Sequence, residues 1–382
     1  MLKNGQSMNS RPAGLRVVSM GGGTGLSTLL SGLKHRVRHG SRLGNDSVLP
    51  QAPFISDLTA IVAVTDDGGS SGRLRSDFKM LAPGDMRSCM VALAEDEQLL
   101  SRLFDHRFRS EGELRGHSFG NLFIAALAEM TGDFARAIQL AGEVLEIRGR
   151  VFPSTSVNAI LAARMEDGSI VRGETRIGIS RERIVEVMLE PADAPPLTEA
   201  LHAIAGADLI TVGPGSLYTS LITNLLVSGI PEALATTRAT RVYIANLMTE
   251  ANESLGLTVS EHIERIYEHA GRPIFDYALV NTGPVSAAVR ARYAAEGAEP
   301  TIADIKRIEA MGIRCITGDF VAEGDLLRHA ANLVTEALLA LPGPSLPWGP
   351  DRARRVHGYI QDVSSRSFVP LEEVATLSGH PG

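Results

Sequence analysis

A run of glycines between an apolar strand and an apolar helix is the feature that most restricts how this chain can fold. The segment Val17–Lys34 reads VVSMGGGTGLSTLLSGLK. It predicts a strand over Leu15–Ser19, a turn over Gly21–Gly25 and a helix that starts near Leu26. Glycine lets backbone N–H groups approach an anion closely, and the start of a helix attracts negative charge. We therefore expect a phosphate at this turn, with a tight turn that binds no ligand as the alternative.

Two well-known phosphate-binding fingerprints do not fit this turn. The dinucleotide fingerprint G-x-G-x-x-G needs a third glycine where the chain has Leu26. The P-loop needs Gly-Lys-Ser/Thr, which is absent here. The turn therefore predicts a phosphate without identifying the molecule that carries it.

Composition excludes several classes of function. The chain has 382 residues, a formal net charge of −7 and 5% aromatic residues, and it lacks a basic run, which argues against a nucleic-acid partner. No run of about 18 apolar residues predicts a membrane span, and the first 14 residues lack the apolar core of a signal peptide. The two cysteines, Cys89 and Cys315, form neither a disulfide framework nor a zinc motif, so we expect a cytoplasmic protein.

Strands alternate with helices along most of the chain, which predicts an α/β fold with a doubly wound, mainly parallel, Rossmann-like sheet. We expect a flexible leader over residues 1–14, one domain over 15–341, and a Pro-rich, poorly ordered tail over 342–382. Within the domain, residues 151–190 predict a small antiparallel β insertion. The polar segment Arg36–Asp57 predicts an exposed loop.

Helical periodicity is clearest in three segments. The apolar positions of Phe119–Met130 form a stripe, Asp133–Ile147 continues as helix, and Ala330–Leu341 closes the domain. The last of these would have Arg328 and His329 at its start, where a cation opposes the helix dipole unless something negative is near.

Ligands bind beyond the carboxyl ends of the strands in sheets of this kind, so the residues that follow each strand are the candidate site. Asp66 and Asp67 follow the short apolar strand within Thr59–Thr65 and could bind Mg²⁺, bind ribose hydroxyls or act as a base; the alternative is an ordinary turn. The full set of candidate ligand-binding residues is Gly21, Gly22, Gly23, Thr24, Gly25, Asp66, Asp67, Arg87, His117, Asn121, Gly213, Gly215, Ser216, Tyr218, Thr219, Asn246, Thr249 and Arg328.

Several of these candidates sit in predicted first turns of helices. Asp85 could cap a helix whose first turn holds Arg87, and Ser118 could cap another whose first turn holds Asn121, with His117 just before it. A second Gly-rich turn, Val212–Ser220 (VGPGSLYTS), is expected to open a helix. Gathered at one edge of one sheet, the two Gly-rich turns and these polar groups suit a ligand with two phosphates and a sugar or nucleoside.

Seven ordered motifs carry a resemblance to a known family. They are GGGTGLSTLLSGLK, TDDGGSSGRLR, PGDMRSCMVALA, GHSFGNLFIAAL, IRGRVFPSTS, GPGSLYTS and EGDLLRH. In this order they resemble the YvcK-type gluconeogenesis factors, within the wider family of the 2-phospho-L-lactate transferase CofD. The resemblance implies a cytoplasmic bacterial protein that binds a UDP-sugar, with UDP-N-acetylglucosamine the leading candidate. It also implies a role in cell shape and wall synthesis during growth on gluconeogenic carbon sources.

Three functions remain open from the sequence. The first is a UDP-sugar-binding regulator that acts through an unidentified protein partner. The second is a Mg²⁺-dependent transferase of phosphorus-containing groups that resembles 2-phospho-L-lactate transferase and uses Asp66 and Asp67. The third, an NAD-binding protein, is weakest because the fingerprint fails at Leu26. We favour binding over catalysis because the sequence contains no recognisable nucleophile–base pair. The sequence is also compatible with a homo-oligomer.

Overall fold

The computed structural model describes residues 14–38, 53–95, 99–109, 111–180, 182–324 and 326–341. The expected leader, apart from Gly14, and the expected tail over 342–382 lie outside the described residues. So does most of the predicted exposed loop, over residues 39–52. No helix in the described part of the chain is long and apolar enough to cross a membrane.

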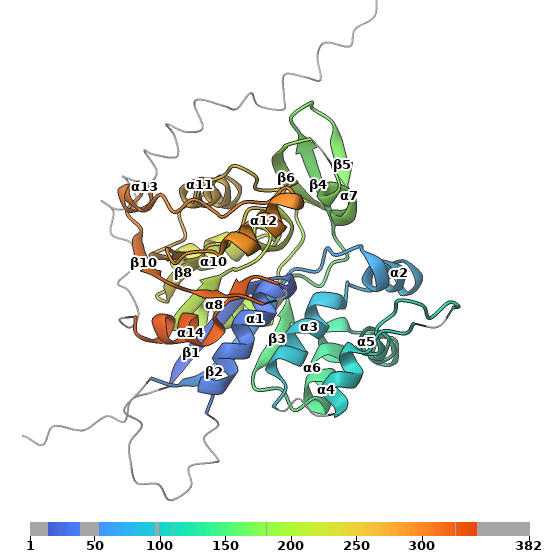
Figure 1. The fold of residues 1–382 in the computed structure, drawn as a ribbon. Coiled ribbons are helices and arrows are strands. Elements are labelled where there is room, and N and C mark those ends of the chain that lie inside the picture. Colours follow the sequence, from blue (N-terminus) through green and yellow to red (C-terminus); the bar gives the residue numbers. More distant parts are fainter. Residues whose placement is uncertain are drawn as a thin grey trace, which may run out of the picture.

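A seven-stranded, all-parallel sheet forms the centre of the fold (Figure 1). Its order is β10-β9-β8-β7-β1-β2-β3. The strands are β1 Leu15–Gly21, β2 Ile55–Val62, β3 Arg150–Pro153, β7 Leu209–Val212, β8 Thr240–Ile244, β9 Tyr277–Asn281 and β10 Arg314–Gly318. The chain runs outward from β1 in one direction and outward from β7 in the other. This confirms the predicted doubly wound sheet and places its topological switch point between β1 and β7.

Helices cover both faces of the sheet, because successive strand residues point to opposite faces and both sets are apolar. Val17 of β1 packs with one cluster, which includes residues of α1, α3, α5, α6 and α14. Val18 and Met20 pack with the other, which includes residues of α8, α10, α11 and α13. The helices are α1 Gly23–Leu33, α2 Gly69–Phe78, α3 Gly84–Leu93, α4 Leu99–Asp105, α5 Phe119–Thr131, α6 Phe134–Val144, α7 Glu174–Gly178, α8 Thr198–Gly206, α9 Thr223–Leu225, α10 Ile230–Thr236, α11 Val259–Ala270, α12 Ala287–Ala295, α13 Ile305–Ala310 and α14 Ala331–Leu339.

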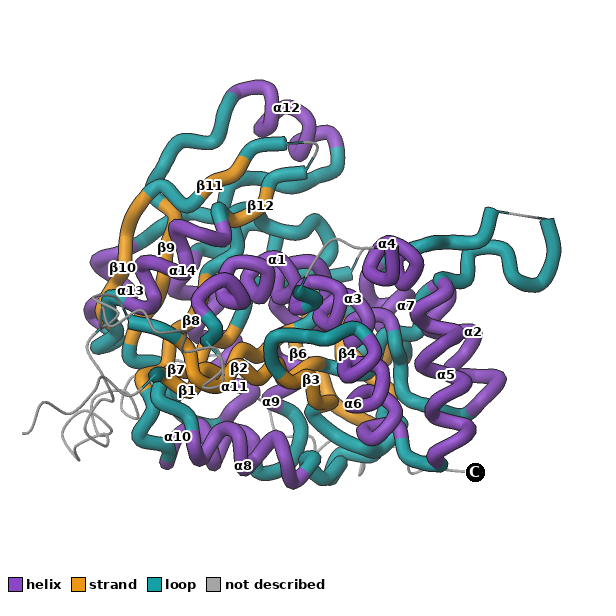
Figure 2. The backbone as a smooth tube through the Cα atoms, turned by 90° about the horizontal axis from the view of Figure 1, so that it is seen from below, coloured by secondary structure: helices purple, strands orange, loops and turns teal. Residues whose placement is uncertain are grey.

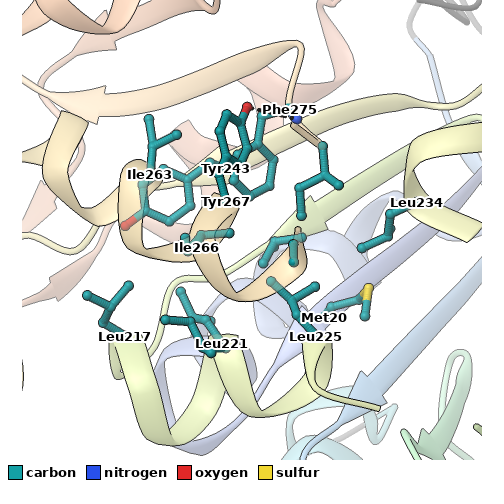
Figure 3. Close-up of a cluster of buried hydrophobic side chains, with 14 of the residues drawn as sticks. Met20, Leu217, Leu221, Leu225, Leu234, Tyr243, Ile263, Ile266, Tyr267 and Phe275 are labelled. Atoms are coloured by element: carbon teal, nitrogen blue, oxygen red, sulfur yellow. Dashed lines mark hydrogen bonds between the residues drawn. The ribbon is translucent and has the colours of Figure 1, made fainter. Parts of the chain in front are cut away.

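The second cluster contains stacked aromatic rings (Figure 3). Phe275 lies between Tyr243 and Tyr267, with ring centroids 5.4 and 5.7 Å away. Met20 of β1 lies near Leu225 of α9 in the same cluster. This packing fixes the end of β1, and so fixes where the first glycine turn begins.

The segment that follows the second Gly-rich turn differs from the prediction. The sequence predicts a single α-helix there, but Leu217–Ile222 forms a π-helical segment, η3, before the short α9. The wider turn lets the Thr223 hydroxyl donate to the Tyr218 carbonyl, at 2.9 Å. The α5 prediction is confirmed, and its N-cap is Ser118, whose side chain accepts from the N–H of Asn121.

The antiparallel insertion is confirmed, but it begins later than predicted. It has the order β5-β4-β6, with β4 Ile160–Met165, β5 Ile170–Arg172 and β6 Ile184–Glu190. The predicted start at residue 151 is wrong because Arg150–Pro153 pairs in parallel with β2 and belongs to the central sheet.

The predicted position of Arg328 and His329 at the start of the closing helix is wrong. They form β12, Arg328–His329, which pairs antiparallel with β11, Val321–Ala322. The N–H of Ala330 donates to the carbonyl of Phe320 at 2.7 Å, which holds the chain in the hairpin until α14 begins. Figure 2 shows this hairpin beside α12. We call α12, Ala287–Ala295, together with β11 and β12 the cap.

Candidate functional site

A cleft of about 360 Å³ lies at the switch point of the sheet. Three loops form it, and each follows the carboxyl end of a strand: β1, β7 and β8. The end of α12 and the strand β12 complete the wall. The residues that line it are Gly22, Gly23, Thr24, Gly25, Thr28, Pro214, Gly215, Ser216, Ser220, Asn246, Leu247, Met248, Thr249, Glu250, Ala251, Tyr293, Glu296, Ala298, Leu327, Arg328 and His329.

The two Gly-rich turns pack directly against each other. A Cβ atom on Gly25 would lie 2.4 Å from the Pro214 carbonyl oxygen and 2.7 Å from its carbon. Such distances are impossible against rigid backbone, so position 25 requires glycine. Gly23 has a φ of +61°, the left-handed region that favours glycine, and no atom lies within 4 Å of its would-be Cβ. One glycine therefore serves close packing and the other serves the bend of the chain.

A carboxylate already occupies the N-terminal end of α1. The N–H of Gly23 donates to Oδ2 of Asp85, at 2.6 Å. The prediction that Asp85 caps its own helix is wrong: Pro83 is the N-cap of α3, and it makes no side-chain cap. Asp85 reaches across to the partial positive charge at the start of α1 instead. Burial raises the pKa of Asp85 to about 6.

A second carboxylate occupies the start of η3. The carboxylate of Glu253 accepts from the N–H of Tyr218 at 2.9 Å, the N–H of Thr219 at 3.3 Å and the Thr219 hydroxyl at 2.8 Å. The side chain of Tyr218 packs in the core and is 1% exposed, so this candidate lies beneath the turn rather than in the cleft. Burial raises the pKa of Glu253.

The β8 loop holds the second turn in place and adds a carboxylate to the cleft. Asn246 donates to the Gly215 carbonyl at 2.8 Å and accepts from the Gly215 N–H at 3.2 Å. The hydroxyl of Thr249 donates to the Glu299 carbonyl at 3.2 Å. Glu250 lines the cleft, where the neighbouring Ser216 side chain favours its ionised form. Burial, and then the neighbouring charge of Glu253, raise the pKa of Glu250 to about 7.

The cap brings a cation to the cleft. Arg328 is exposed and lines the cleft, and Nε2 of its neighbour His329 lies 3.2 Å from the Ala245 carbonyl at the end of β8. The phenol oxygen of Tyr293, from α12, accepts from the N–H of Leu327 at 3.1 Å. The guanidinium of Arg292 donates to the carbonyl of Gly324 at 3.3 Å. The helix thus holds the strand that carries Arg328.

The aspartate pair lies beside the cleft lining rather than in it. Asp66 accepts from the N–H of Gly68, and Asp67 accepts from the N–H of Thr175 in α7, both at 2.8 Å. Glu174 lies close by, and burial, followed by the charges of Asp66 and Asp85, raises its pKa well above the ordinary glutamate value. Among the described residues, no group of three or more His, Cys, Asp or Glu side chains is arranged to hold a metal ion.

Arg87, His117 and Asn121 form a separate buried network. Arg87 pairs with Asp105 and donates to the Asn121 side chain at 3.1 Å. Asn121 donates to the hydroxyl of Ser70 at 3.1 Å, and that hydroxyl lies 3.0 Å from Nδ1 of His117. None of the three candidates lines the cleft. The conflict between Arg87 and the helix dipole is relieved by an acidic neighbour, Asp105.

The structure therefore brings part of the predicted set of ligand-binding residues together in one cleft. Gly22, Gly23, Thr24, Gly25, Gly215, Ser216, Asn246, Thr249 and Arg328 line one cleft. Gly21, Gly213 and Thr219 lie next to lining residues without lining it themselves. Sequence reasoning missed Glu250 and Tyr293. Glu250 follows Thr249 after the same strand, so the rule that selects Thr249 could have found it; no local pattern marks Tyr293.

This chain is similar to known proteins over most of its described length. The family model of "2-phospho-L-lactate transferase CofD" matches residues 17–321. The gluconeogenesis factor of Halalkalibacterium halodurans is 48% identical over 324 residues, which are 85% of this chain and 95% of that protein. The gluconeogenesis factor of Bacillus subtilis is 41% identical over 327 residues, 85% of this chain and 98% of that protein. A crystal structure of a UPF0052-family protein from Bacillus halodurans superposes with a TM-score of 0.79 at 47% identity, covering 85% of this chain and 99% of that one.

Proposed function

Because this chain belongs to the CofD family, we propose that it is a cytoplasmic UDP-sugar-binding regulatory protein of the gluconeogenesis-factor type, with UDP-N-acetylglucosamine as its ligand. In this role the protein reports the supply of wall precursors and acts through a protein partner. It would be required for cell morphogenesis and wall synthesis on gluconeogenic carbon sources. The observation that carries the proposal is the cleft at the switch point, where two Gly-rich turns face Arg328.

Backbone geometry supports a phosphate at this cleft. Thr24 and Gly25 lie in the first turn of α1, where N–H groups have no intrahelical carbonyl to pair with. Arg328 offers a planar, charged group that can bind phosphate oxygens in a bidentate manner. Mononucleotide and dinucleotide ligands bind in this position in other doubly wound sheets.

The charges behind the turns predict how binding depends on a cation. Asp85 and Glu253 hold the start of α1 and of η3, so a diphosphate would approach two carboxylates from the cleft side. Like charges repel strongly where burial lowers the dielectric constant. We therefore expect Mg²⁺ to strengthen binding by offsetting this repulsion.

One observation favours a second candidate, a Mg²⁺-dependent transferase like 2-phospho-L-lactate transferase. After burial, the charge of Asp66 raises the pKa values of Asp85 and Glu174, and the charge of Asp85 also raises that of Glu174. Binding remains the better-supported function, because the same carboxylates are engaged by backbone or hydroxyl donors of this chain. NAD binding is the weakest candidate, because Leu26 is fully buried where the fingerprint needs glycine.

Calorimetric titration tests the proposal directly. The parent protein is titrated with UDP-N-acetylglucosamine, GDP and NAD⁺, each with and without Mg²⁺. We expect UDP-N-acetylglucosamine to bind most tightly and Mg²⁺ to strengthen that binding. Tighter binding of NAD⁺, or turnover of a phosphorylated donor, would replace the proposal with one of the other two functions.

The regulatory role needs a test in cells. The chain is expressed in a Bacillus subtilis strain that lacks its own gluconeogenesis factor, on a gluconeogenic carbon source. We expect restored growth and cell shape with the parent chain, and loss of both with Arg328→Ala. Full rescue by a variant that has lost UDP-sugar binding would separate the cellular role from the cleft.

A further inference from the structure

Three carboxylates surround the two glycine turns, but they are used differently by the protein. Asp85 accepts from the N–H of Gly23, and Glu253 accepts from two N–H groups and a hydroxyl of η3. These two side chains satisfy the backbone and hold the turns in shape. Glu250 is not used in this way, since its carboxylate contacts the Ser216 side chain and faces the cleft.

The surroundings of Glu250 leave its carboxylate in need of donors. Within the described residues it forms no ion pair, and its N–H, rather than its side chain, is held by the hydroxyl of Ser254 at 3.0 Å. A mostly buried carboxylate with unused acceptor capacity is costly unless hydrogen-bond donors reach it. Arg328 lines the same cleft, but its side chain is exposed on β12 and does not supply such a donor.

The cleft therefore has two chemically distinct parts. The part formed by the first glycine turn and Arg328 offers N–H groups and positive charge, which suit phosphate. The part formed by the β8 loop offers the Glu250 carboxylate, with Ser216 beside it, which suits hydroxyl and amide donors. A phosphate next to Glu250 would meet a like charge, whereas a sugar there would supply donors.

We propose that Glu250 determines specificity for the sugar, by accepting hydrogen bonds from hydroxyl or amide N–H groups of a hexose that lies over the β8 loop. This inference rests on the proposed function, since it takes a nucleotide diphosphate as the anchor of the ligand. It orients that ligand: the diphosphate lies at the glycine turn and Arg328, and the sugar lies at Glu250. The preference for a sugar nucleotide over the free nucleotide then comes from one side chain.

The test compares two probes, UDP and UDP-N-acetylglucosamine, in the same Mg²⁺ buffer by calorimetry. We expect the parent to bind the sugar nucleotide at least tenfold more tightly than UDP, as one charge-assisted hydrogen bond can provide. Glu250→Gln should reduce this ratio by about tenfold and leave the affinity for UDP unchanged or higher. Glu250→Asp keeps the charge but shortens the side chain by one methylene, which moves the carboxylate away from the sugar. This variant should therefore also lower the ratio of the two affinities.

Glu296→Gln is the matched control. Glu296 lines the same cleft but is exposed at its rim, so removing its charge should leave the ratio unchanged. Melting temperatures of all variants establish that they are folded. If Glu250 had only a structural role, its substitution would weaken the binding of both probes by the same factor and leave the ratio of the two affinities unchanged.

The outcomes separate this inference from the proposed function. If the parent binds UDP and UDP-N-acetylglucosamine equally, or if both Glu250 variants keep the parent's ratio, the sugar assignment is wrong while a UDP site stands. If neither probe binds, the proposed function fails and the inference fails with it. A ratio that collapses in Glu250→Gln and Glu250→Asp but not in Glu296→Gln supports both.

Discussion

Replacing Asp85 by asparagine should stabilise the protein at neutral pH. The carboxylate is held in a partly buried position by the N–H of Gly23, and burial raises its pKa to about 6, from an ordinary aspartate value near 4. Each pKa unit corresponds to about 1.4 kcal/mol, so keeping Asp85 ionised in the folded state costs about 2–3 kcal/mol. The Asn side chain keeps an acceptor for the Gly23 N–H and removes the buried charge.

The sign of the pH dependence follows from the raised pKa. Between pH 4 and 6 the folded protein holds a proton on Asp85 that the unfolded chain has released, so this group lowers stability as pH rises through that window. Below about pH 4 the group is protonated in both states and contributes nothing. The difference in stability between Asp85→Asn and the parent should therefore grow from pH 4 to 6 and stay constant above it.

Thermal unfolding from pH 4 to pH 8 measures this difference. For a chain of 382 residues, 2–3 kcal/mol corresponds to a rise in melting temperature of about 3–4 °C at pH 7. A variant that is less stable than the parent at pH 8, or a difference that does not change with pH, would refute the reasoning. Asp85→Asn should also bind UDP more tightly without Mg²⁺, and a loss of affinity seen only with Mg²⁺ would assign Asp85 to a bound cation instead.

Three further predictions concern the turns and the cap. Arg328→Ala should weaken UDP-N-acetylglucosamine binding about tenfold to a hundredfold in calorimetry. Arg328→Lys should restore part of this affinity, because lysine keeps the charge but lacks the planar guanidinium. An affinity equal to the parent's in the alanine variant would show that Arg328 is an ordinary surface arginine. Tyr293→Phe removes the acceptor for the Leu327 N–H and should weaken binding severalfold in the parent background but not beside Arg328→Ala. Gly25→Ala should lower the free energy of unfolding by about 1–3 kcal/mol in denaturant titration and abolish binding, since its Cβ would meet the backbone of Pro214; a stable variant with parent-like affinity would contradict the close packing.

The parts of the fold that depend on local sequence can be predicted well. The strand, glycine turn and helix at the start of the chain follow from apolar patterning and from glycine, and the structure places them over Leu15–Leu33. The antiparallel insertion can also be recognised, because the turn near Gly168 separates two alternating segments. The predicted start of this insertion is wrong, because the local sequence of Arg150–Pro153 does not indicate which of the two sheets this strand joins.

The contacts that build the site are harder to predict, because they join residues far apart in the chain. Asp85 contacts Gly23 across 62 positions, while its own helix offers a plausible local use for it as a cap. The apolar stripe of α14 follows Arg328 and favours a helix there, while the two-residue partner strand has too little sequence to be recognised. The conflict of Arg87 with the helix dipole suggests a ligand, but the structure resolves that conflict internally through Asp105.

The order of the central strands also governs when the cleft can exist during synthesis. The chain makes β1 first, but one of its neighbours, β7, lies about 190 residues later, and Asp208 just before β7 is hydrogen-bonded to Arg16. The packing of α1 forms still later, because its contacts involve residues near the end of the described chain. Arg36 pairs with Glu336, 300 positions away, and Gly32 packs on the backbone of Ala331. Pairings this distant in sequence are slow to close and form late in folding. A nascent chain that stops before β12 has both glycine turns but no Arg328, so ligand binding becomes available only to a chain translated almost to its end.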